Sequence, residues 1–187
     1  MTLLGMNNGV AAALMTTALA TGVVAQEVET KQYDDGGIYE GTFLDGKQHG
    51  TGTYRLPNGY EYTGEWIEGE IRGQGIARFP DGSIYEGAFV AGKPEGQGTM
   101  TFADGGTFTG EWLDGNITGQ GTATYANGVV YEGAFRNAMH NGVGTMTSPG
   151  GYVYEGPWVN GVKEGEGSIT YPDGSTYVGT LVAGERQ

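Results

Sequence analysis

The residues that could do chemistry in this sequence are two histidines and 22 acidic side chains. Histidine is the commonest metal ligand in proteins, and a pair of carboxylates can hydrolyse a glycosidic bond. His49 and His140 lie in units four apart in the repeat described below, so one metal ion would have to bridge roughly 40 Å. No carboxylate pair stands out from an acidic background that recurs along the chain. We therefore interpret both histidines as turn residues and predict that the chain is not an enzyme.

Acidic residues near the expected turns could bind Ca²⁺, which prefers oxygen ligands. The sequence has no Asp-x-Asp-x-Asp-Gly loop and no nine-residue calcium repeat. Ordinary turn chemistry accounts for these carboxylates without a metal, so we predict no metal ion and no cofactor. The residues concerned include Asp45, Glu68, Asp81, Asp104, Asp114 and Asp173.

Regularly spaced aromatic side chains are the candidate binding or packing residues. They could serve as spacers packed between neighbouring hairpins, or they could line a groove that holds an extended or helical peptide or a sugar chain. The sequence leaves both interpretations open. The set consists of Tyr39, Phe43, Tyr62, Trp66, Tyr85, Phe89, Phe108, Trp112, Tyr131, Phe135, Tyr154 and Trp158.

Composition limits the kinds of partner and of fold. Nine Lys and Arg against 22 Asp and Glu give a formal net charge of -13, which opposes nucleic acid and disfavours anionic phospholipid. The chain has 38 Gly and a hydrophobic fraction of 37%, which is low for one large core. It has no Cys, so neither disulfides nor thiolate chemistry can contribute. These values favour a repetitive β architecture.

A period of 23 residues dominates the chain from residue 39 onward. Each unit begins with an aromatic residue, has Gly at its third position and, in the first six units, a second aromatic at its fifth. Two further glycines follow, as at Gly50 and Gly52, and each full unit closes with a turn dipeptide such as Asn58-Gly59. The expected units are 39–61, 62–84, 85–107, 108–130, 131–153, 154–176 and a partial unit at 177–187.

Each unit is expected to form two antiparallel strands, at positions 1 to 6 and 12 to 18. Alternation along the first strand places both aromatics and the Gly on one face, and Thr, Glu or Ala on the other. Glycines inside the strands are explained sterically, because a side chain there would collide with a ring from a neighbouring position. We predict an all-β, elongated, single-layer antiparallel sheet of hairpins, with local irregularity in the fifth unit around Ala138.

The residues Tyr39-Glu40-Gly41, Asp45-Gly46-Lys47 and His49-Gly50-Thr51-Gly52 resemble the MORN repeat, a 23-residue motif. The resemblance covers residues 39 to 187. It implies a twisted single-layer sheet whose groove docks protein segments, together with a proposed phospholipid contact. Because such repeats also accompany lipid kinase domains, a kinase name would be carried over from those proteins; no phosphate-binding glycine loop occurs here. The Lys-x-His-Gly stretch is intact only at Lys47 to Gly50, which weakens a repeated basic lipid-binding stripe.

The amino-terminal segment has the features of a signal peptide. Residues 1 to 26 carry no charged side chain, and Val10 to Ala20 form a short apolar run, which is expected to be helical. We expect cleavage after Ala25, or failing that after Ala20, and assign residues 26–38 to an N-terminal cap. The alternative is an uncleaved membrane anchor. The predicted location is therefore the periplasm or the outside of the cell.

Taken together, the sequence predicts a non-catalytic scaffold that binds a protein partner in the cell envelope. The net charge favours a partner with basic side chains. Self-association at the end strands is an alternative use of the array, since unpaired strand edges attract further strands. Contact with phospholipid and recognition of a glycan by aromatic stacking remain the alternatives.

Overall fold

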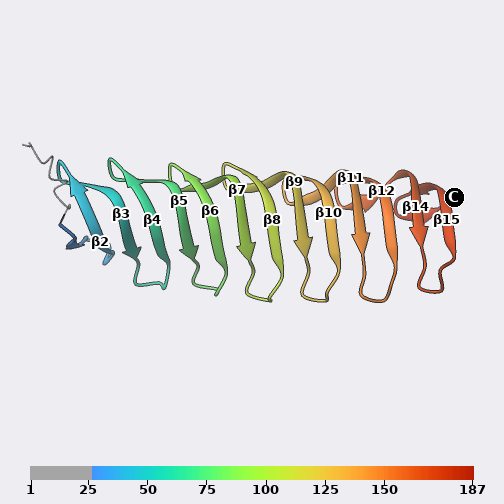
Figure 1. Ribbon diagram of the computed structural model, residues 1–187, viewed down its shortest axis with the longest axis horizontal. Helices are drawn as coiled ribbons and strands as arrows, with labels where there is room; N and C mark the ends of the chain where they lie inside the picture. Colours follow the sequence, from blue (N-terminus) through green and yellow to red (C-terminus); the bar gives the residue numbers. More distant parts are fainter. Residues whose placement is uncertain (1–26) are drawn as a thin grey trace, which may run out of the picture.

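The computed structural model describes residues 27–187, which form one continuous antiparallel sheet of 16 strands in a single layer (Figure 1). The predicted all-β hairpin array is therefore confirmed. The described residues contain no helix, and hence none long and apolar enough to cross a membrane. The signal segment expected at residues 1–25 lies outside the described residues.

Strands follow one another in space almost in chain order, and β13 alone lies off the main path, where it pairs with β12. The strands are β1 (Glu29–Gln32), β2 (Ile38–Leu44), β3 (Lys47–Arg55), β4 (Glu61–Ile67), β5 (Glu70–Arg78), β6 (Ile84–Val90), β7 (Lys93–Thr101), β8 (Thr107–Leu113), β9 (Asn116–Thr124), β10 (Val130–Arg136), β11 (Met139–Thr147), β12 (Val153–Val159), β13 (Val162–Lys163), β14 (Gly165–Thr170), β15 (Thr176–Val182) and β16 (Glu185–Arg186).

Two kinds of turn alternate along the array. A tight turn joins the two strands of each hairpin, and both of its central residues have positive φ, as at Asp45 (51°) and Gly46 (75°). A wider turn joins one hairpin to the next; between β3 and β4, Asn58 Oδ1 accepts the Tyr60 N–H at 2.9 Å. The second strand of each unit begins directly after the tight turn, at position 9, so the predicted start at position 12 was wrong. The prediction took the glycine at position 12 for the first residue of this strand, whereas positions 9 and 10 already pair with the first strand, as Leu44 with Lys47 and Phe43 with Gln48.

A row of glycines crosses the sheet and accepts the tyrosine rings. Gly41 pairs with Gly52, and Gly52 pairs with Gly64 in the next hairpin. A Cβ atom on Gly52 would lie 2.3 Å from the Tyr39 hydroxyl oxygen, so no side chain fits there. The predicted steric role of these glycines is confirmed. Immediately beyond the row the pairing register shifts, as between Gly41 and Phe43, which bends the hairpin around the ring.

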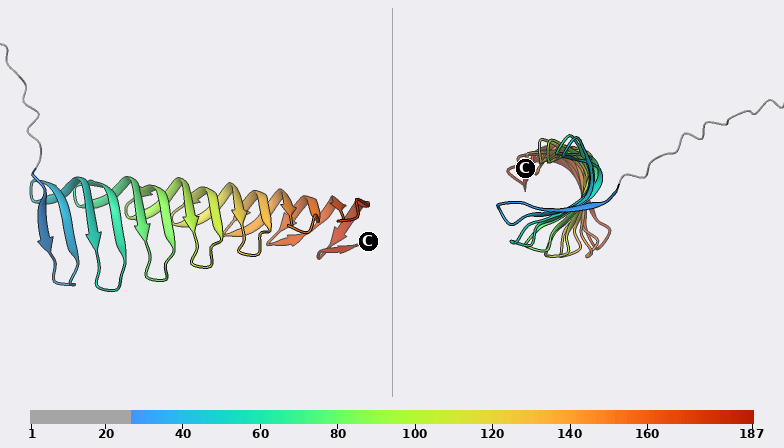
Figure 2. Two further views of the ribbon diagram at one scale, coloured as in Figure 1. Left: turned by 60° about the horizontal axis from the view of Figure 1, so that its bottom comes forward. Right: turned by 90° about the vertical axis from the view of Figure 1, so that its left-hand side faces the viewer.

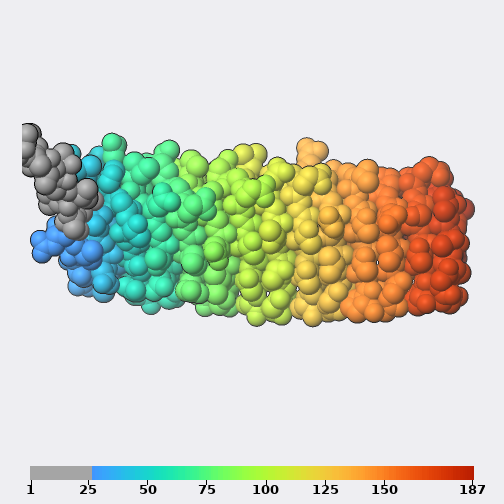
Figure 3. All heavy atoms as spheres, in the orientation of Figure 1, coloured from blue at the N-terminus to red at the C-terminus, as the bar shows by residue number. Residues whose placement is uncertain are grey.

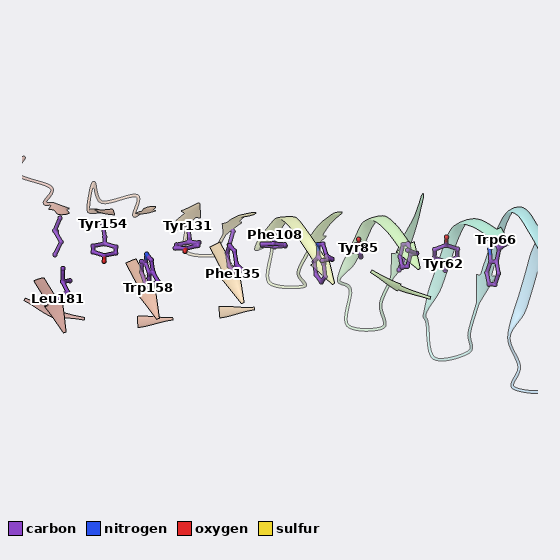
Figure 4. Close-up of a cluster of buried hydrophobic side chains, with 14 of the residues drawn as sticks. Tyr62, Trp66, Tyr85, Phe108, Tyr131, Phe135, Tyr154, Trp158 and Leu181 are labelled. Carbon is purple, nitrogen blue, oxygen red and sulfur yellow. The ribbon is translucent and has the colours of Figure 1, made fainter. Parts of the chain in front are cut away.

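The bent hairpins curl the sheet into an open C in cross-section (Figure 2). The aromatic side chains fill the inside of this curve and form one column under the strands (Figure 4). From outside, the described residues form an unbroken rod (Figure 3). Tyr39, Tyr62 and Tyr154 are completely buried, which a flat single layer could not achieve. The curl is therefore what gives a sheet without a second layer its core.

The predicted irregularity of the fifth unit is confined to its tight turn, where Ala138 takes the place of Gly, and a larger irregularity that was not predicted lies in the sixth unit. β11 in the fifth unit keeps its full length, although Ala138 holds φ at 60°. In the sixth unit the second strand is divided into β13 and β14 at Glu164. Pro157, on the facing strand β12, has no N–H to donate to the ladder, which accounts for the interruption.

Candidate binding faces

The inner face carries the aromatic column, in which rings of successive hairpins pack edge to face. The first aromatic of each unit meets the second aromatic of the next; the Tyr39 and Trp66 centroids are 5.1 Å apart, as are those of Tyr85 and Trp112. Trp66 Nε1–H donates to the Gly52 carbonyl at 3.2 Å. Burial raises the pKa of Tyr85 to about 12. These polar groups are thus held inside the packed array.

Eleven of the twelve candidate aromatics are buried, and Phe43 is partly buried against them. As placed, these rings pack against one another and offer little surface to a ligand. The buried members are Tyr39, Tyr62, Trp66, Tyr85, Phe89, Phe108, Trp112, Tyr131, Phe135, Tyr154 and Trp158.

The two histidines lie in strands, so their interpretation as turn residues was wrong. His49 is in β3 and His140 is in β11, eight strands away, or on the order of 38 Å. His140 is buried because it stacks on Tyr131 with ring centroids 3.6 Å apart. Its Nε2 atom hydrogen-bonds the Tyr125 hydroxyl at 2.7 Å. Residues 27–187 contain no group of three His, Asp or Glu side chains that could hold a metal ion.

Two basic side chains lie on the inner face at the position that His140 has in its own unit. Lys163 and Arg186 occupy the position of His140 in the sixth and seventh units, as their pairing with the second-aromatic position shows. Lys163 Nζ lies 4.6 Å from the Tyr152 ring centroid and 5.0 Å from that of Tyr154. Its ammonium group also donates to the Tyr152 hydroxyl at 2.7 Å. These cations are held by aromatic rings at the carboxyl-terminal end of the array.

The opposite face is polar and carries a shallow groove over the glycine row. Three adjoining hollows share lining residues: the first and second share Gln74 and Glu86, and the second and third share Gln97 and Thr109. The groove, which we call the polar groove, runs from Thr63 in β4 to Thr145 in β11. Its largest hollow has a volume of about 650 Å³.

Glutamines at one position of three successive units line the polar groove. Gln74, Gln97 and Gln120 each stand between two glycines, and all three side chains are exposed. The Gln74 backbone N–H donates to Glu65 Oε1 at 3.1 Å, and the Gln120 N–H donates to Glu111 Oε1 at 3.2 Å. The prediction from sequence missed these glutamines, although the recurring Gly-Gln-Gly triplet was a visible signal.

Basic side chains do little to neutralise the outer surface. All nine Lys and Arg lie within the described residues, and four of them form ion pairs with only four of the 22 carboxylates. Three others lie over aromatic rings and two have neither partner. The ion-paired cations are Arg55, Arg72, Arg78 and Lys93, and those over rings are Lys31, Lys163 and Arg186.

The fold and its period define an open-sheet repeat protein, in which each hairpin packs only on its neighbours. The MORN repeat model matches this chain at residues 39–59, 62–84, 85–107, 108–130, 131–151 and 154–176. The chain therefore belongs to the MORN repeat family, and the predicted resemblance is confirmed. The matched repeats are structural modules, and the match includes no catalytic domain.

Comparison with individual proteins extends this assignment only at the level of the repeat and the fold. The chain is 42% identical to rat (Rattus norvegicus) alsin over 50 residues, which cover 24% of this chain and 3% of alsin. The TCP domain of Drosophila melanogaster SAS-4, solved in complex with a proline-rich motif of Ana2, matches 95% of this chain and 99% of its own with a TM-score of 0.51 and 11% identity. A crystal structure of the TCP10c domain of Drosophila Sas-4 matches with a TM-score of 0.47 and 10% identity, over 84% of this chain and all of the other.

Proposed function

We propose that this chain is a non-catalytic MORN-repeat scaffold of the cell envelope that binds a protein partner. In this proposal the polar groove holds an extended, basic segment of that partner. The observation that carries the proposal is the groove itself, which crosses eight strands without interruption and is lined by carboxylates and amides.

The dimensions of the groove suit an extended chain. The seven spacings between these eight strands, at about 4.8 Å each, give a length of roughly 34 Å, which an extended segment of about ten residues would span. The floor is glycine backbone whose hydrogen bonds are already made within the sheet, so the side chains along the walls must supply the polar contacts. Gln and Thr offer donors and acceptors, and the Glu side chains offer charge.

Charge supports a basic partner. Glu86, Glu111 and Glu132 line the polar groove, and none of them has an ion-pair partner in the described part of the chain. A Lys or Arg of the partner would meet uncompensated carboxylates there, and a net charge of -13 would steer it from a distance. The same field opposes anionic phospholipid.

The Drosophila SAS-4 domain supports the general mode of binding. That protein has a similar fold and was solved in complex with a proline-rich motif of Ana2. An open sheet of hairpins can therefore offer a surface to a peptide segment. At 11% identity the likeness carries the fold alone, so the chemistry proposed for this chain rests on its own groove.

The experiment is capture from a cell-envelope extract at low and high salt, with crosslinking and identification by mass spectrometry. The test variant carries Glu86→Gln, Glu111→Gln and Glu132→Gln, which remove charge from the groove and keep the shape of the side chains. The matched control carries Glu27→Gln, Glu29→Gln and Glu185→Gln, which remove the same charge at the ends of the described chain.

We expect one partner that binds the wild type and the control variant equally well and binds the groove variant roughly tenfold less tightly. Its binding should weaken as the salt concentration rises. Equal capture by both variants would refute the groove as the site. Tight binding to anionic vesicles with no recovered protein would assign the chain a lipid-contact role. Binding to purified envelope glycan that resists salt would assign it a glycan-binding role.

Self-association at the end strands is a separate part of the proposal. Within the described chain, only β16 pairs with the outer edge of β15, and it does so only at Leu181 and Val182. Most of the outer edge of β15 is therefore open to a strand of a second copy. Sedimentation at increasing protein concentration tests it: a dimer that persists at high salt is expected, and a monomer at all concentrations would refute it.

A further inference from the structure

Carboxylates recur along the polar groove at a fixed spacing of one per hairpin. Glu65, Glu86, Glu111 and Glu132 lie in β4, β6, β8 and β10, which are the first strands of four successive hairpins (Figure 1). Two strands advance about 9.6 Å across the sheet, so the four side chains are spread over roughly 29 Å. A partner that lies along the groove therefore meets one acidic side chain at each step of the repeat.

The carboxylates stand alternately on the two walls of the polar groove, on either side of its glycine floor. Glu86 and Glu132 come directly before a floor glycine, at position 2 of their units, whereas Glu65 and Glu111 come directly after one, at position 4. Positions 2 and 4 share one face of the strand and lie about 6.7 Å apart. Successive carboxylates thus form a zigzag along the groove.

Two of these carboxylates are held in place by the backbone of the second strand of their own hairpin. Glu65 Oε1 accepts the Gln74 N–H at 3.1 Å, and Glu111 Oε1 accepts the Gln120 N–H at 3.2 Å. A carboxylate has two oxygens, so each of these groups keeps one oxygen for a ligand. The spacing of these acidic groups is therefore set by the fold and not only by flexible side chains.

Basic side chains of the described chain do not compensate these carboxylates. No Lys or Arg of residues 27–187 lines the groove, and Arg72 and Arg78, on β5 near its start, are already ion-paired with Glu70 and Glu61. The residues that pair with the carboxylates across neighbouring strands are uncharged: Thr51 for Glu65, Ile76 and Thr99 for Glu86, Gln97 and Thr118 for Glu111, and Thr122 and Thr145 for Glu132. Cations that match this row must therefore come from a partner.

The spacing of the carboxylates selects the sequence of an extended segment. A β-strand rises by 3.2 to 3.4 Å per residue, so three residues advance about 9.6 to 10.2 Å and reach the next hairpin. Two residues advance about 6.6 Å and four about 13 Å, so both fall out of step by the second hairpin. Three residues also reverse the side to which a side chain of the strand points, which follows the zigzag of the walls.

The exposed glutamines repeat at the same interval. Gln74, Gln97 and Gln120 each stand at position 13 of the second, third and fourth units. An amide side chain both donates and accepts hydrogen bonds, so it can bind the backbone of the residues between two basic ones. Each of these three hairpins thus offers one carboxylate and one amide to the segment.

We propose that the polar groove recognises a sequence pattern, namely a β-type extended segment with Lys or Arg at every third position and uncharged residues between them. This rests on the proposed function, since it specifies the segment that the groove binds. Basic residues at positions i, i+3, i+6 and i+9 of the segment pair with the four carboxylates in turn.

The test measures the binding of three synthetic peptides to the full chain at physiological salt. Each peptide has 13 residues with blocked ends, and all three have the same four Lys and nine Ser and Thr. The regular peptide has Lys at every third residue, and the controls have it at every second or at every fourth residue. The same measurements are made on the variant with Glu86→Gln, Glu111→Gln and Glu132→Gln, and on the matched variant with Glu27→Gln, Glu29→Gln and Glu185→Gln.

We expect wild type and the matched variant to bind the regular peptide about tenfold more tightly than either control, since an exposed ion pair contributes a factor of about two and the controls lose up to three pairs. The groove variant should bind all three peptides equally weakly. Equal binding of the three peptides to wild type would overturn the proposal. Tightest binding of the peptide with Lys at every second residue would also overturn it, because charge density alone would then explain binding.

The proposed function and this pattern can fail separately. An envelope partner that the groove variant loses, together with no preference among the peptides, would keep the groove as the binding site and refute the three-residue pattern. A tenfold preference for the regular peptide, with no partner recovered from the envelope extract, would support the pattern and count against the proposed role in the envelope.

Discussion

At the scale of single residues, the stability of the array depends on rings held between neighbouring hairpins. The Trp112 centroid lies 5.1 Å from that of Tyr85 and 5.6 Å from that of Phe108, and its Nε1–H donates to the Gly98 carbonyl at 3.2 Å. Its side chain is buried. Each hairpin thus contributes a ring that fills space in the next.

Replacing Trp112 by Ala should lower the free energy of unfolding by about 3 to 5 kcal/mol, because the removed ring leaves a cavity between two hairpins. Urea melts of wild type and variant measure the difference. As a control, Val178→Ala removes an exposed side chain and should change stability by less than about 0.5 kcal/mol. Superimposable melts for Trp112→Ala would show that the ring does not pack.

Among the buried groups, His140 makes the core sensitive to acid. Burial lowers its pKa below the usual value of 6.5, and it has no ion-pair partner in the described residues. The groups that face it are aromatic: Tyr131, Phe135, Trp158 and the Tyr125 hydroxyl. Since the unfolded chain binds the proton more readily, the contribution of neutral His140 to stability is full above about pH 6.5 and is lost as the pH falls toward the folded pKa.

We therefore expect wild type to lose more stability than His140→Gln between about pH 7.5 and about pH 5.5. Gln is a matched replacement because Gln48 occupies the equivalent position in the first unit. Carboxylates common to both proteins cancel in the comparison, which is made by urea unfolding at each pH. Identical losses in the two proteins would contradict a role for His140.

At the scale of the hairpin, the tight turns require positive φ at both central residues. Gly occupies the second turn position in six hairpins and Ala138 occupies it in the fifth, with φ at 60°. A side chain in this conformation costs about 1 kcal/mol or more. The fifth hairpin is thus held by its neighbours in a turn that its own residues disfavour.

Replacing Ala138 by Gly should raise the free energy of unfolding by about 1 kcal/mol. The reciprocal change, Gly115→Ala, should lower it by a similar amount, because a Cβ there meets no atom within 4 Å and the cost is conformational alone. Thermal or urea unfolding measures both. A lower stability for Ala138→Gly would contradict the assignment of strain to this turn.

Much of the hairpin structure could be predicted from the sequence because the signals for it were local and repeated. The 23-residue period and the Gly row each determine geometry within a few residues. The Asn58-Gly59 type of dipeptide, which is typical of tight primed turns, instead lies in the wider turn between hairpins, where only the Gly has positive φ. The strand starts were placed late because glycine in a strand resembles a strand end. The buried place of His140 follows from pairing across the tight turn, which the sequence does not display.

At the scale of the whole molecule, the curl and the polar groove are collective properties. The curl arises from a register shift repeated in successive hairpins, and the groove exists only where the outer faces of eight strands adjoin. Neither could be predicted from one unit. The polar groove was missed for the same reason, although its glutamines recur at the period of the repeat.

Location is the other property of the whole chain, and it stays a prediction from the apolar segment Val10 to Ala20. Mass spectrometry of the mature protein from an envelope fraction should find Gln26 at the amino terminus, or failing that Thr21. Soluble cytoplasmic protein that retains Met1 would contradict export.

The central claim is that the polar groove binds a basic, extended segment of a protein partner. The most direct measurement is site-specific photo-crosslinking in a cell-envelope extract, with the crosslinking residue in place of Val143 or of Val178. Both valines are highly exposed, at 73% and 79%, but Val143 lines the groove and Val178, in β15, lies beyond it. We predict that the Val143 position captures one partner protein through a segment containing Lys or Arg and that the Val178 position does not capture this partner. Equal capture at both positions, or capture only at Val178, would contradict the account.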